Sequence, residues 1–156
     1  RLNNSHINQR FLSPLNQPIN FKLNKFFRKL TKNKKKNLKI LEIKGRELKI
    51  ENFYEGIVKF NIKELFDKNL GSEDYIKIAA NSNFIFLENL PNFDESNSNQ
   101  QQRFITFIDI VYEKKIPLMI TSVSDIKLIK SSKNLIDPFR RTISRLYELT
   151  SIKYKV

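Results

Sequence analysis

NFIFLENLP, residues 83–91, is the stretch that decides the fold. Its apolar run has the length of a strand and is uninterrupted, which is typical of a strand covered on both faces of a sheet. A polar loop follows, and apolar residues then recur at the spacing of one helix face: Phe104, Phe107, Ile108 and Val111. Residues 116–121 supply a second apolar strand. Strand, helix and strand at this spacing predict a parallel, right-handed βαβ crossover and therefore an α/β fold with a partly parallel sheet.

Ligands of such sheets bind beyond the carboxyl ends of the strands. Here these positions are Glu88, Asn89, Thr121 and Ser122. No phosphate-binding loop stands beside them in this sequence, so we assign them no metal or nucleotide role.

Upstream, LKILEIKGRELKI, residues 38–50, alternates apolar and polar residues around Lys44 and Gly45. This pattern predicts a β-hairpin, in which Arg46 is an exposed strand residue. Residues 56–60 predict another strand, and Asn61 with Glu64 forms a capping box for a short helix.

The basic residues are concentrated in FKLNKFFRKLTKNKKKNLK, residues 21–39, within a chain of net charge +13. The apolar spacing predicts a helix with one buried face, followed by a lysine-rich loop. We therefore divide the chain into a helical, lysine-rich connecting segment, 1–37, and an α/β domain, 38–156. The candidates for a partner-binding or phosphate-binding surface are Lys32, Lys34, Lys35 and Lys36. A solvated loop, nucleic-acid contacts and an anionic membrane surface all remain open, although no nucleic-acid motif accompanies the charge.

Composition excludes several classes of chemistry within these 156 residues. The chain has no cysteine, and its one histidine, His6, lies in a polar opening segment where we expect a surface position. Disulfides, cysteine-ligated zinc and histidine-assisted nucleophiles are therefore absent. We assign no catalytic residue and no metal ligand.

The end of the chain, DPFRRTISRLYELTSIKY, residues 137–154, predicts an amphipathic helix. Asp137 is the expected cap, with Pro138 in the first helical position. Phe139, Ile143, Leu146 and Leu149 form the apolar stripe, and the other face carries Arg141, Ser144, Arg145 and Glu148. Two interpretations stand at this point: the arginines grip a phosphate or an acidic partner, or the face is solvated and Glu148 pairs with Arg145.

Five segments, in order, resemble one known family. These segments are similar to the carboxyl-terminal portion of the ZapE family of AAA+ ATPases: FLSPL (11–15), Gly45-Arg46, LGSEDYIKIA (70–79), QRFITFIDIVYEKKIPLMITS (102–122) and the FxRTxSRLxE pattern beginning at Phe139. The family includes the mitochondrial lactation-elevated-protein ATPases. Three positions depart from the family pattern, namely Gln102, Asn89 and Leu149.

The resemblance implies the carboxyl-terminal part of a P-loop NTPase-family protein that couples ATP hydrolysis to cell division or membrane-protein handling. It makes Arg141, Arg145 and, less directly, Arg103 the nucleotide-sensing candidates. ATP and Mg²⁺ are implied for a complete protein. This chain has three glycines, none in a GxxxxGK[ST] setting, so we expect it to bind neither alone and not to hydrolyse ATP.

The same resemblance implies partners and a location. The expected partners are an upstream ATPase core, further copies of the chain, and a division-ring or membrane-associated protein; no nucleic acid is expected. The expected location is the cytoplasm, at the periphery of the inner membrane, or the mitochondrion in a eukaryote. The alternative function is a basic, non-catalytic module that binds an acidic protein, an anionic membrane or nucleic acid.

Overall fold

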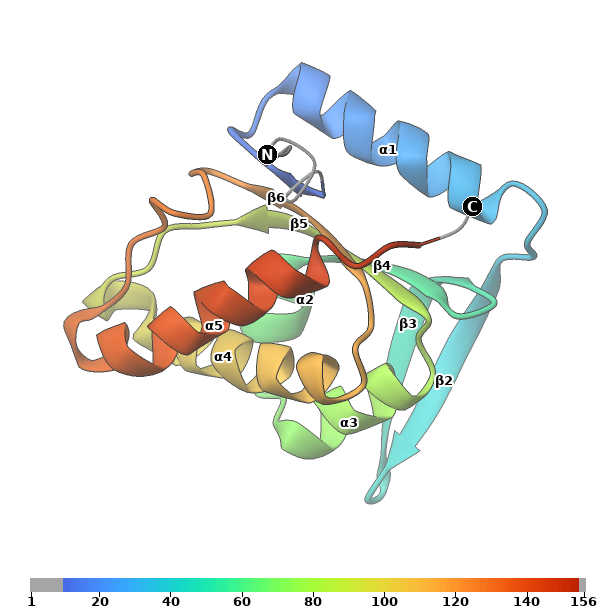
Figure 1. The fold of residues 1–156 in the computed structure, drawn as a ribbon. Coiled ribbons are helices and arrows are strands. Elements are labelled where there is room, and N and C mark those ends of the chain that lie inside the picture. Colours follow the sequence, from blue (N-terminus) through green and yellow to red (C-terminus); the bar gives the residue numbers. More distant parts are fainter. Residues whose placement is uncertain (1–9, 155–156) are drawn as a thin grey trace.

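Three layers of secondary structure make up the fold of residues 10–154, the part of the chain that a computed structural model describes. Helix α1 (Gln17–Thr31) lies on one face of a mixed sheet, and the remaining helices lie on the other (Figure 1). These are α2 (Ile62–Phe66), α3 (Ser72–Ala80), α4 (Ser98–Glu113) and α5 (Ile136–Leu149). The strands are β1 (Phe11–Leu12), β2 (Asn37–Ile43), β3 (Arg46–Tyr54), β4 (Ile57–Asn61), β5 (Phe84–Leu90) and β6 (Leu118–Ser122).

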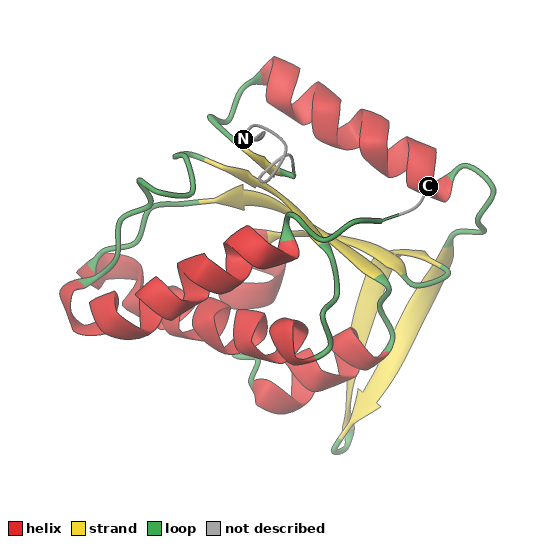
Figure 2. Cartoon of the chain, in the orientation of Figure 1, coloured by secondary structure: helices red, strands yellow, loops and turns green. Residues whose placement is uncertain are grey.

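The sheet has six strands in the order β1-β6-β5-β4-β3-β2. Strands β1, β6, β5 and β4 are parallel, whereas β3 is antiparallel to both β4 and β2. The predicted βαβ crossover is β5-α4-β6, and the predicted hairpin is β2-β3. The α/β class and both supersecondary units are therefore confirmed (Figure 2).

Two tight turns connect the antiparallel strands. Lys44 and Gly45 have φ values of 45° and 81°, and Glu55 and Gly56 have 54° and 96°. Two consecutive residues with positive φ are the requirement of a type I′ hairpin turn, whose twist matches that of the strands. A Cβ atom on Gly56 would also lie 2.3 Å from the amide nitrogen of the Asn83 side chain, which would have to move, and the positive φ strains any other residue type at this position.

Each face of the sheet has its own apolar core. The larger core lies between the sheet and helices α2–α5 and includes Tyr75, Phe104 and Phe107, all fully buried. The smaller one lies under α1, where Leu23 and Phe27 pack on Phe84 and Phe86. The continuous apolar run of β5 is explained by its central place between these two cores.

The predicted amino-terminal helix is confirmed as α1, whose Asn16 side chain accepts a hydrogen bond from the Ile19 N–H at 2.9 Å. The expected boundary at residues 37 and 38 falls at the start of β2, and the sheet contains strands from both sides of it. His6 lies outside the described residues.

The start of the terminal helix differs from the sequence prediction. Helix α5 begins at Ile136, and its cap position is Leu135, which makes no side-chain cap. A 3-10 turn over Lys133–Leu135 leads directly into α5, so Asp137 already lies in the first helical turn and does not cap it. Its carboxylate instead contacts Arg140 at 3.3 Å.

Of the helices in residues 10–154, none is both long and apolar enough to cross a membrane.

Candidate functional site: an arginine cluster between helices α4 and α5

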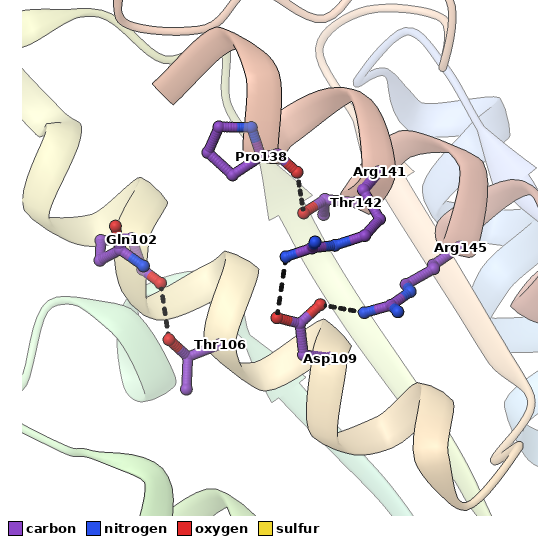
Figure 3. A network of polar contacts seen from close by, with 7 residues as sticks. All are labelled: Gln102, Thr106, Asp109, Pro138, Arg141, Thr142 and Arg145. Carbon is purple, nitrogen blue, oxygen red and sulfur yellow. Dashed lines mark hydrogen bonds and ion pairs between the residues drawn. The ribbon is translucent and has the colours of Figure 1, made fainter. Parts of the chain in front are cut away.

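Arg141 and Arg145 of α5 both point toward Asp109 of α4 (Figure 3). Arg145 Nη1 donates a hydrogen bond to Asp109 Oδ1. Arg141 Nη2 lies 3.8 Å from Oδ2 of the same carboxylate, which is ion-pair distance but longer than a hydrogen bond. The four-residue spacing places both guanidiniums one turn apart on one side of α5. Two positive charges therefore share one negative charge at this surface.

The two arginines differ in how firmly they are held. Arg145 is 24% exposed, and its guanidinium lies 4.7 Å from the centre of the Tyr112 ring. An arginine stacked on an aromatic ring and bonded to a carboxylate has little remaining freedom. The Arg141 side chain is 58% exposed, and Asp109 is the one carboxylate within ion-pair distance of it among the described residues. Arg141 thus has hydrogen-bond donors available for a ligand, whereas Arg145 mainly holds the two helices together.

Glu148 pairs across the interface and not along its own helix. It accepts hydrogen bonds from Lys115 Nζ at 2.9 Å and from the Tyr112 hydroxyl at 3.0 Å. Both hydrogen bonds lower the pKa of Glu148, and the one from Lys115 has the larger effect. The hydrogen bonds to Tyr112 and Glu148 raise the pKa of Lys115. The expected pairing of Glu148 with Arg145 is therefore wrong, because Arg145 is already bound to Asp109.

The threonine hydroxyls nearby do not join the cluster. Thr142 Oγ1 donates to the Pro138 carbonyl at 3.2 Å, and Thr106 Oγ1 donates to the Gln102 carbonyl at 3.1 Å (Figure 3). Both hydroxyls are used within their own helices, so the chemistry of the cluster is that of guanidinium and carboxylate groups.

Arg103 is separate from the other two candidates. It lies six residues before Asp109 on α4. Six helical residues correspond to a rotation of about 240° around the axis, so Arg103 and Asp109 lie on different sides of α4. Its Nη1 donates to the Phe66 carbonyl at 2.9 Å, at the end of α2. Arg103 thus satisfies a helix-end carbonyl and links α2 to α4.

The lysine candidates lie elsewhere again. Lys32, Lys34, Lys35 and Lys36 are all exposed in the turn after α1. Glu55 accepts a hydrogen bond from the Lys35 backbone N–H at 2.9 Å and fixes this turn near the second hairpin. Because α1 and α5 cover opposite faces of the sheet, the lysine loop and the arginine cluster are two distinct basic surfaces (Figure 1).

The polar residues at the carboxyl ends of β5 and β6 are used to hold the sheet together. Asn89 has φ of 71° at a bulge, and its N–H donates to Thr121 Oγ1 at 3.0 Å. Ser122 is fully buried and accepts from the Ser124 N–H at 3.2 Å. Glu88 lies 4.0 Å from Lys59. These contacts within the protein explain why polar residues stand at all four positions, and no ligand is needed for that explanation.

Clusters of metal-ligating side chains and glycine-rich turns are the remaining features from which a magnesium or phosphate site is commonly built. Within residues 10–154, no group of three or more His, Cys, Asp or Glu side chains is placed to hold a metal ion. Of the three glycines, Gly45 and Gly56 occupy hairpin turns and Gly71 precedes α3. We therefore derive no hydrolytic step through these residues.

Two charged residues have structural roles that sequence reasoning missed or misjudged. Arg10 is 7% exposed and donates to the carbonyls of Thr150 at 3.1 Å, Leu149 at 3.2 Å and Ile152. It also lies 5.3 Å from the Phe84 ring centre. Burial lowers the pKa of Arg10 to about 10. No local pattern identifies Arg10, because its partners are some 140 residues downstream.

Arg46 is the second such residue. It is not simply an exposed strand residue, because its Nη1 and Nη2 lie 2.6 Å and 2.7 Å from the two carboxylate oxygens of the buried Asp74. The Asp74 Oδ2 atom also accepts from the Gly71 N–H at 2.8 Å, in the first turn of α3. Burial opposes ionisation of Asp74, but these hydrogen bonds and the charge of Arg46 together lower its pKa.

The three-layer fold, with its mixed and mostly parallel sheet, is consistent with a domain of the P-loop NTPase class. The AFG1-like ATPase family model matches residues 1–156, and the chain therefore belongs to this family. No solved structure matches the chain significantly.

Two curated relatives show how far the similarity extends. The chain is 25% identical over 144 residues to the cell division protein ZapE of Escherichia coli K12, which is 92% of this chain and 38% of that protein. It is 28% identical over 82 residues to lactation elevated protein 1 homolog B of Danio rerio, 53% of this chain and 16% of that protein. The chain thus spans well under half the length of these relatives.

Proposed function

We propose that the chain forms the carboxyl-terminal part of an ATP-hydrolysing protein of this family, in which Arg141 contacts the terminal phosphate of ATP. The nucleotide and Mg²⁺ are held by residues that precede this part or by a neighbouring subunit, which supply the phosphate transfer chemistry. The function of the complete protein is cell division or membrane-protein handling, in the cytoplasm and peripheral to the inner membrane, or in the mitochondrion of a eukaryote.

The observation that carries this proposal is the shared carboxylate. Asp109 compensates one of two guanidiniums, and it holds Arg145 more closely than Arg141. The excess positive charge therefore resides at Arg141, whose planar fork of donors suits a phosphate. An arginine placed against a transferring phosphoryl group stabilises the charge that develops there. If Arg141 contacts ATP that is bound by another copy of the chain, the active form is a homo-oligomer.

The test is ATP hydrolysis by a complete protein that carries Arg141→Ala. We expect kcat to fall by about 10³-fold, the lower end of the effect of an arginine finger, with a smaller change in the KM for ATP. Arg145→Ala, which removes an anchored residue, should chiefly lower the melting temperature. Steady-state kinetics and thermal unfolding of the same preparations separate the two results.

The matched control is Arg140→Ala, because Arg140 is the adjacent exposed arginine and its contact is Asp137 on the same helix. It should leave kcat unchanged. If Arg141→Ala hydrolyses ATP at the normal rate while its far-UV spectrum and melting temperature are unchanged, Arg141 is not the phosphate contact.

A second function is favoured by the lysine loop. Four lysines within five positions are all exposed there. Such a loop attracts an acidic protein, for example one associated with the division ring or membrane, through long-range electrostatics that salt weakens. In this case the chain is an interaction module with no contact to nucleotide.

A further inference from the structure

A groove lies between the loop that follows β6 and helix α5. It has a volume of about 550 Å³. Its apolar lining consists of Ile126, Ile129, Ile136, Phe139 and Ile143, and basic residues at the same groove are Lys127, Lys130 and Arg140. Arg140 and Ile136 lie on a different side of α5 from the guanidiniums that face Asp109.

The exposed apolar residue Ile136 lines this groove, and two more exposed apolar residues, Val123 and Leu128, belong to the loop that contributes to it. Val123 is 38% exposed, Leu128 69% and Ile136 41%. They are three of seven large exposed apolar residues in the described part of the chain, within one stretch of 14 residues. The exposed side chain of Ile136 adds to the apolar surface of the groove, and apolar surface that is rimmed by polar groups is typical of an interaction site.

The loop that carries these residues is fixed in place by hydrogen bonds to the β5-α4 connection. Asn92 Oδ1 accepts from the Lys130 N–H at 2.9 Å, and the fully buried Gln101 contacts both Ser131 Oγ at 2.7 Å and the Ser132 N–H at 3.1 Å. Glu95 accepts from the Lys133 N–H at 2.7 Å. The apolar residues are therefore held in position before any partner arrives, which reduces the entropy cost of binding.

Charge and topology indicate what the groove binds. The residues that line the groove include the basic side chains of Lys127, Lys130 and Arg140 and no acidic one, and Arg140 is paired with Asp137. An acidic partner is thus complementary. Strand β6, which precedes the groove, has a neighbouring strand on each side, β1 and β5, so the groove itself is not the open edge of a strand. An apolar groove beside a helix is instead the setting in which an amphipathic helix lays its apolar face.

We propose that this groove docks an acidic amphipathic helix of a protein partner. Its apolar side chains enter between Ile129 and Ile143, and its flanking carboxylates face Lys127 and Lys130. This site is independent of the proposed phosphate contact at Arg141, and it lies on the other face of the sheet from the lysine loop.

The experiment uses the full chain and a fluorescein-labelled helical peptide with leucines at positions i, i+3, i+4 and i+7 and glutamates on the other face. Fluorescence anisotropy gives the Kd. We expect Lys127→Glu/Lys130→Glu and, separately, Ile136→Ser to weaken binding by about tenfold, a loss typical of important interface residues. All three positions are exposed, so far-UV spectra and melting temperatures should be unchanged.

The matched control is Lys32→Glu/Lys34→Glu, the same charge change in the lysine loop. It should alter the Kd by less than about twofold, because exposed charges at such a distance are screened. An equal loss in this control, or equal binding of a peptide with serine in place of leucine, would refute the groove and leave only general charge attraction.

A second experiment tests whether an anionic membrane, and not a protein helix, binds at this groove. Vesicles of phosphatidylglycerol and phosphatidylcholine replace the peptide in a co-sedimentation assay. If the chain binds these vesicles through Lys127 and Lys130 but does not bind the leucine-glutamate peptide, the surface is a membrane contact and the proposed helix is wrong. Peptide binding that the vesicles do not compete away supports the proposal.

Discussion

Arg141 and Arg145 show how neighbouring residues of one type acquire different roles. Each faces Asp109, but only Arg145 also lies over the Tyr112 ring. Their spacing in the sequence places them on the same side of a helix, but it does not show which one is anchored and which one is available to a ligand. The difference between the two arginines depends on side chains of α4. Asp109, for example, lies 36 residues before Arg145. Only the packing of the two helices therefore shows which arginine is held more firmly.

Arg10 provides the residue-scale prediction on stability. Arg10→Met keeps much of the apolar stem and leaves the terminal carbonyls of α5 without a donor. Because an unsatisfied buried polar group costs about 1–3 kcal/mol, we expect the free energy of unfolding to fall by about 3 kcal/mol for the carbonyls together. Urea denaturation measures this change. Hydrogen exchange should also quicken at the amides of residues 149–152.

Arg140→Met is the appropriate comparison, because it removes an exposed guanidinium from the same fold. It should change stability little. Should both substitutions have the same small effect, Arg10 does not hold the end of α5.

At the scale of elements, the β2-β3 hairpin depends on α3. Strand β3 pairs with β4 through only Phe53 and Tyr54, so most of the hairpin extends past the sheet (Figure 1). The contacts of Arg46 with Asp74, and of Lys44 with Glu73 at 2.6 Å, connect its turn end to α3. The Arg46–Asp74 pair is the more important of the two because Asp74 is buried, whereas fully exposed ion pairs contribute little.

Asp74→Asn should therefore destabilise the protein by about 2 kcal/mol at neutral pH, the typical value for hydrogen bonds to a charged group. The folded-state pKa of Asp74 lies below its ordinary value near 3.8. Its contribution is then fully present above about pH 4 and is lost as the pH falls through the folded-state pKa. Urea denaturation between about pH 7 and pH 3 should show the difference between the two proteins shrinking toward acid.

Asp137→Asn serves as the control, because that carboxylate is 89% exposed. It should alter neither stability at pH 7 nor its acid dependence. A difference between wild type and Asp74→Asn that stays constant with pH would show that the charge of Asp74 is not the stabilising factor.

The elements that sequence could predict are those with local signals. The Lys44-Gly45 turn, the continuous apolar run of β5 and the helical spacing in α4 each depend on a few adjacent residues, and all are confirmed. The start of α5 is the counterexample. Asp137 and Pro138 are good local signals, but the preceding 3-10 turn begins the helix earlier.

At the scale of the whole molecule, local sequence patterns do not show which strands are neighbours in the sheet. Strand β1 is two residues long and pairs with β6, 109 positions away, through Phe11 and Ile120. Such a pairing leaves no periodic signal. The strand-helix-strand pattern predicted the α/β class, and the family resemblance drew attention to Arg141 and Arg145 without predicting that they share Asp109. The apolar groove and the Arg10 contacts come from packing between distant segments.

Net charge gives the whole-molecule prediction. A charge of +13 on 156 residues produces self-repulsion that favours unfolding. Raising NaCl from about 0.01 M to about 0.15 M shortens the Debye length from about 30 Å to about 8 Å. We expect the melting temperature to rise by about 3 °C, equivalent to about 1 kcal/mol for a domain of this size. Thermal unfolding followed by circular dichroism tests this.

Lys34→Gln/Lys36→Gln lowers the positive charge in the lysine loop and should reduce the response to salt. A melting temperature that falls with added NaCl would mean that the ion pairs between helices outweigh the repulsion.

Arg10 fixes the end of α5 through residues 149–152, in addition to the contact of Arg145 with Asp109 farther along the helix. At a rise of about 1.5 Å per residue, Arg145 lies about 8 Å and Arg141 about 13 Å from Thr150 along the helix axis. Any tilt about that fixed end displaces Arg141 almost twice as far as Arg145. Because Arg10 directly precedes β1, the position of this end of α5, and with it that of Arg141, depends on where the first strand of the sheet lies.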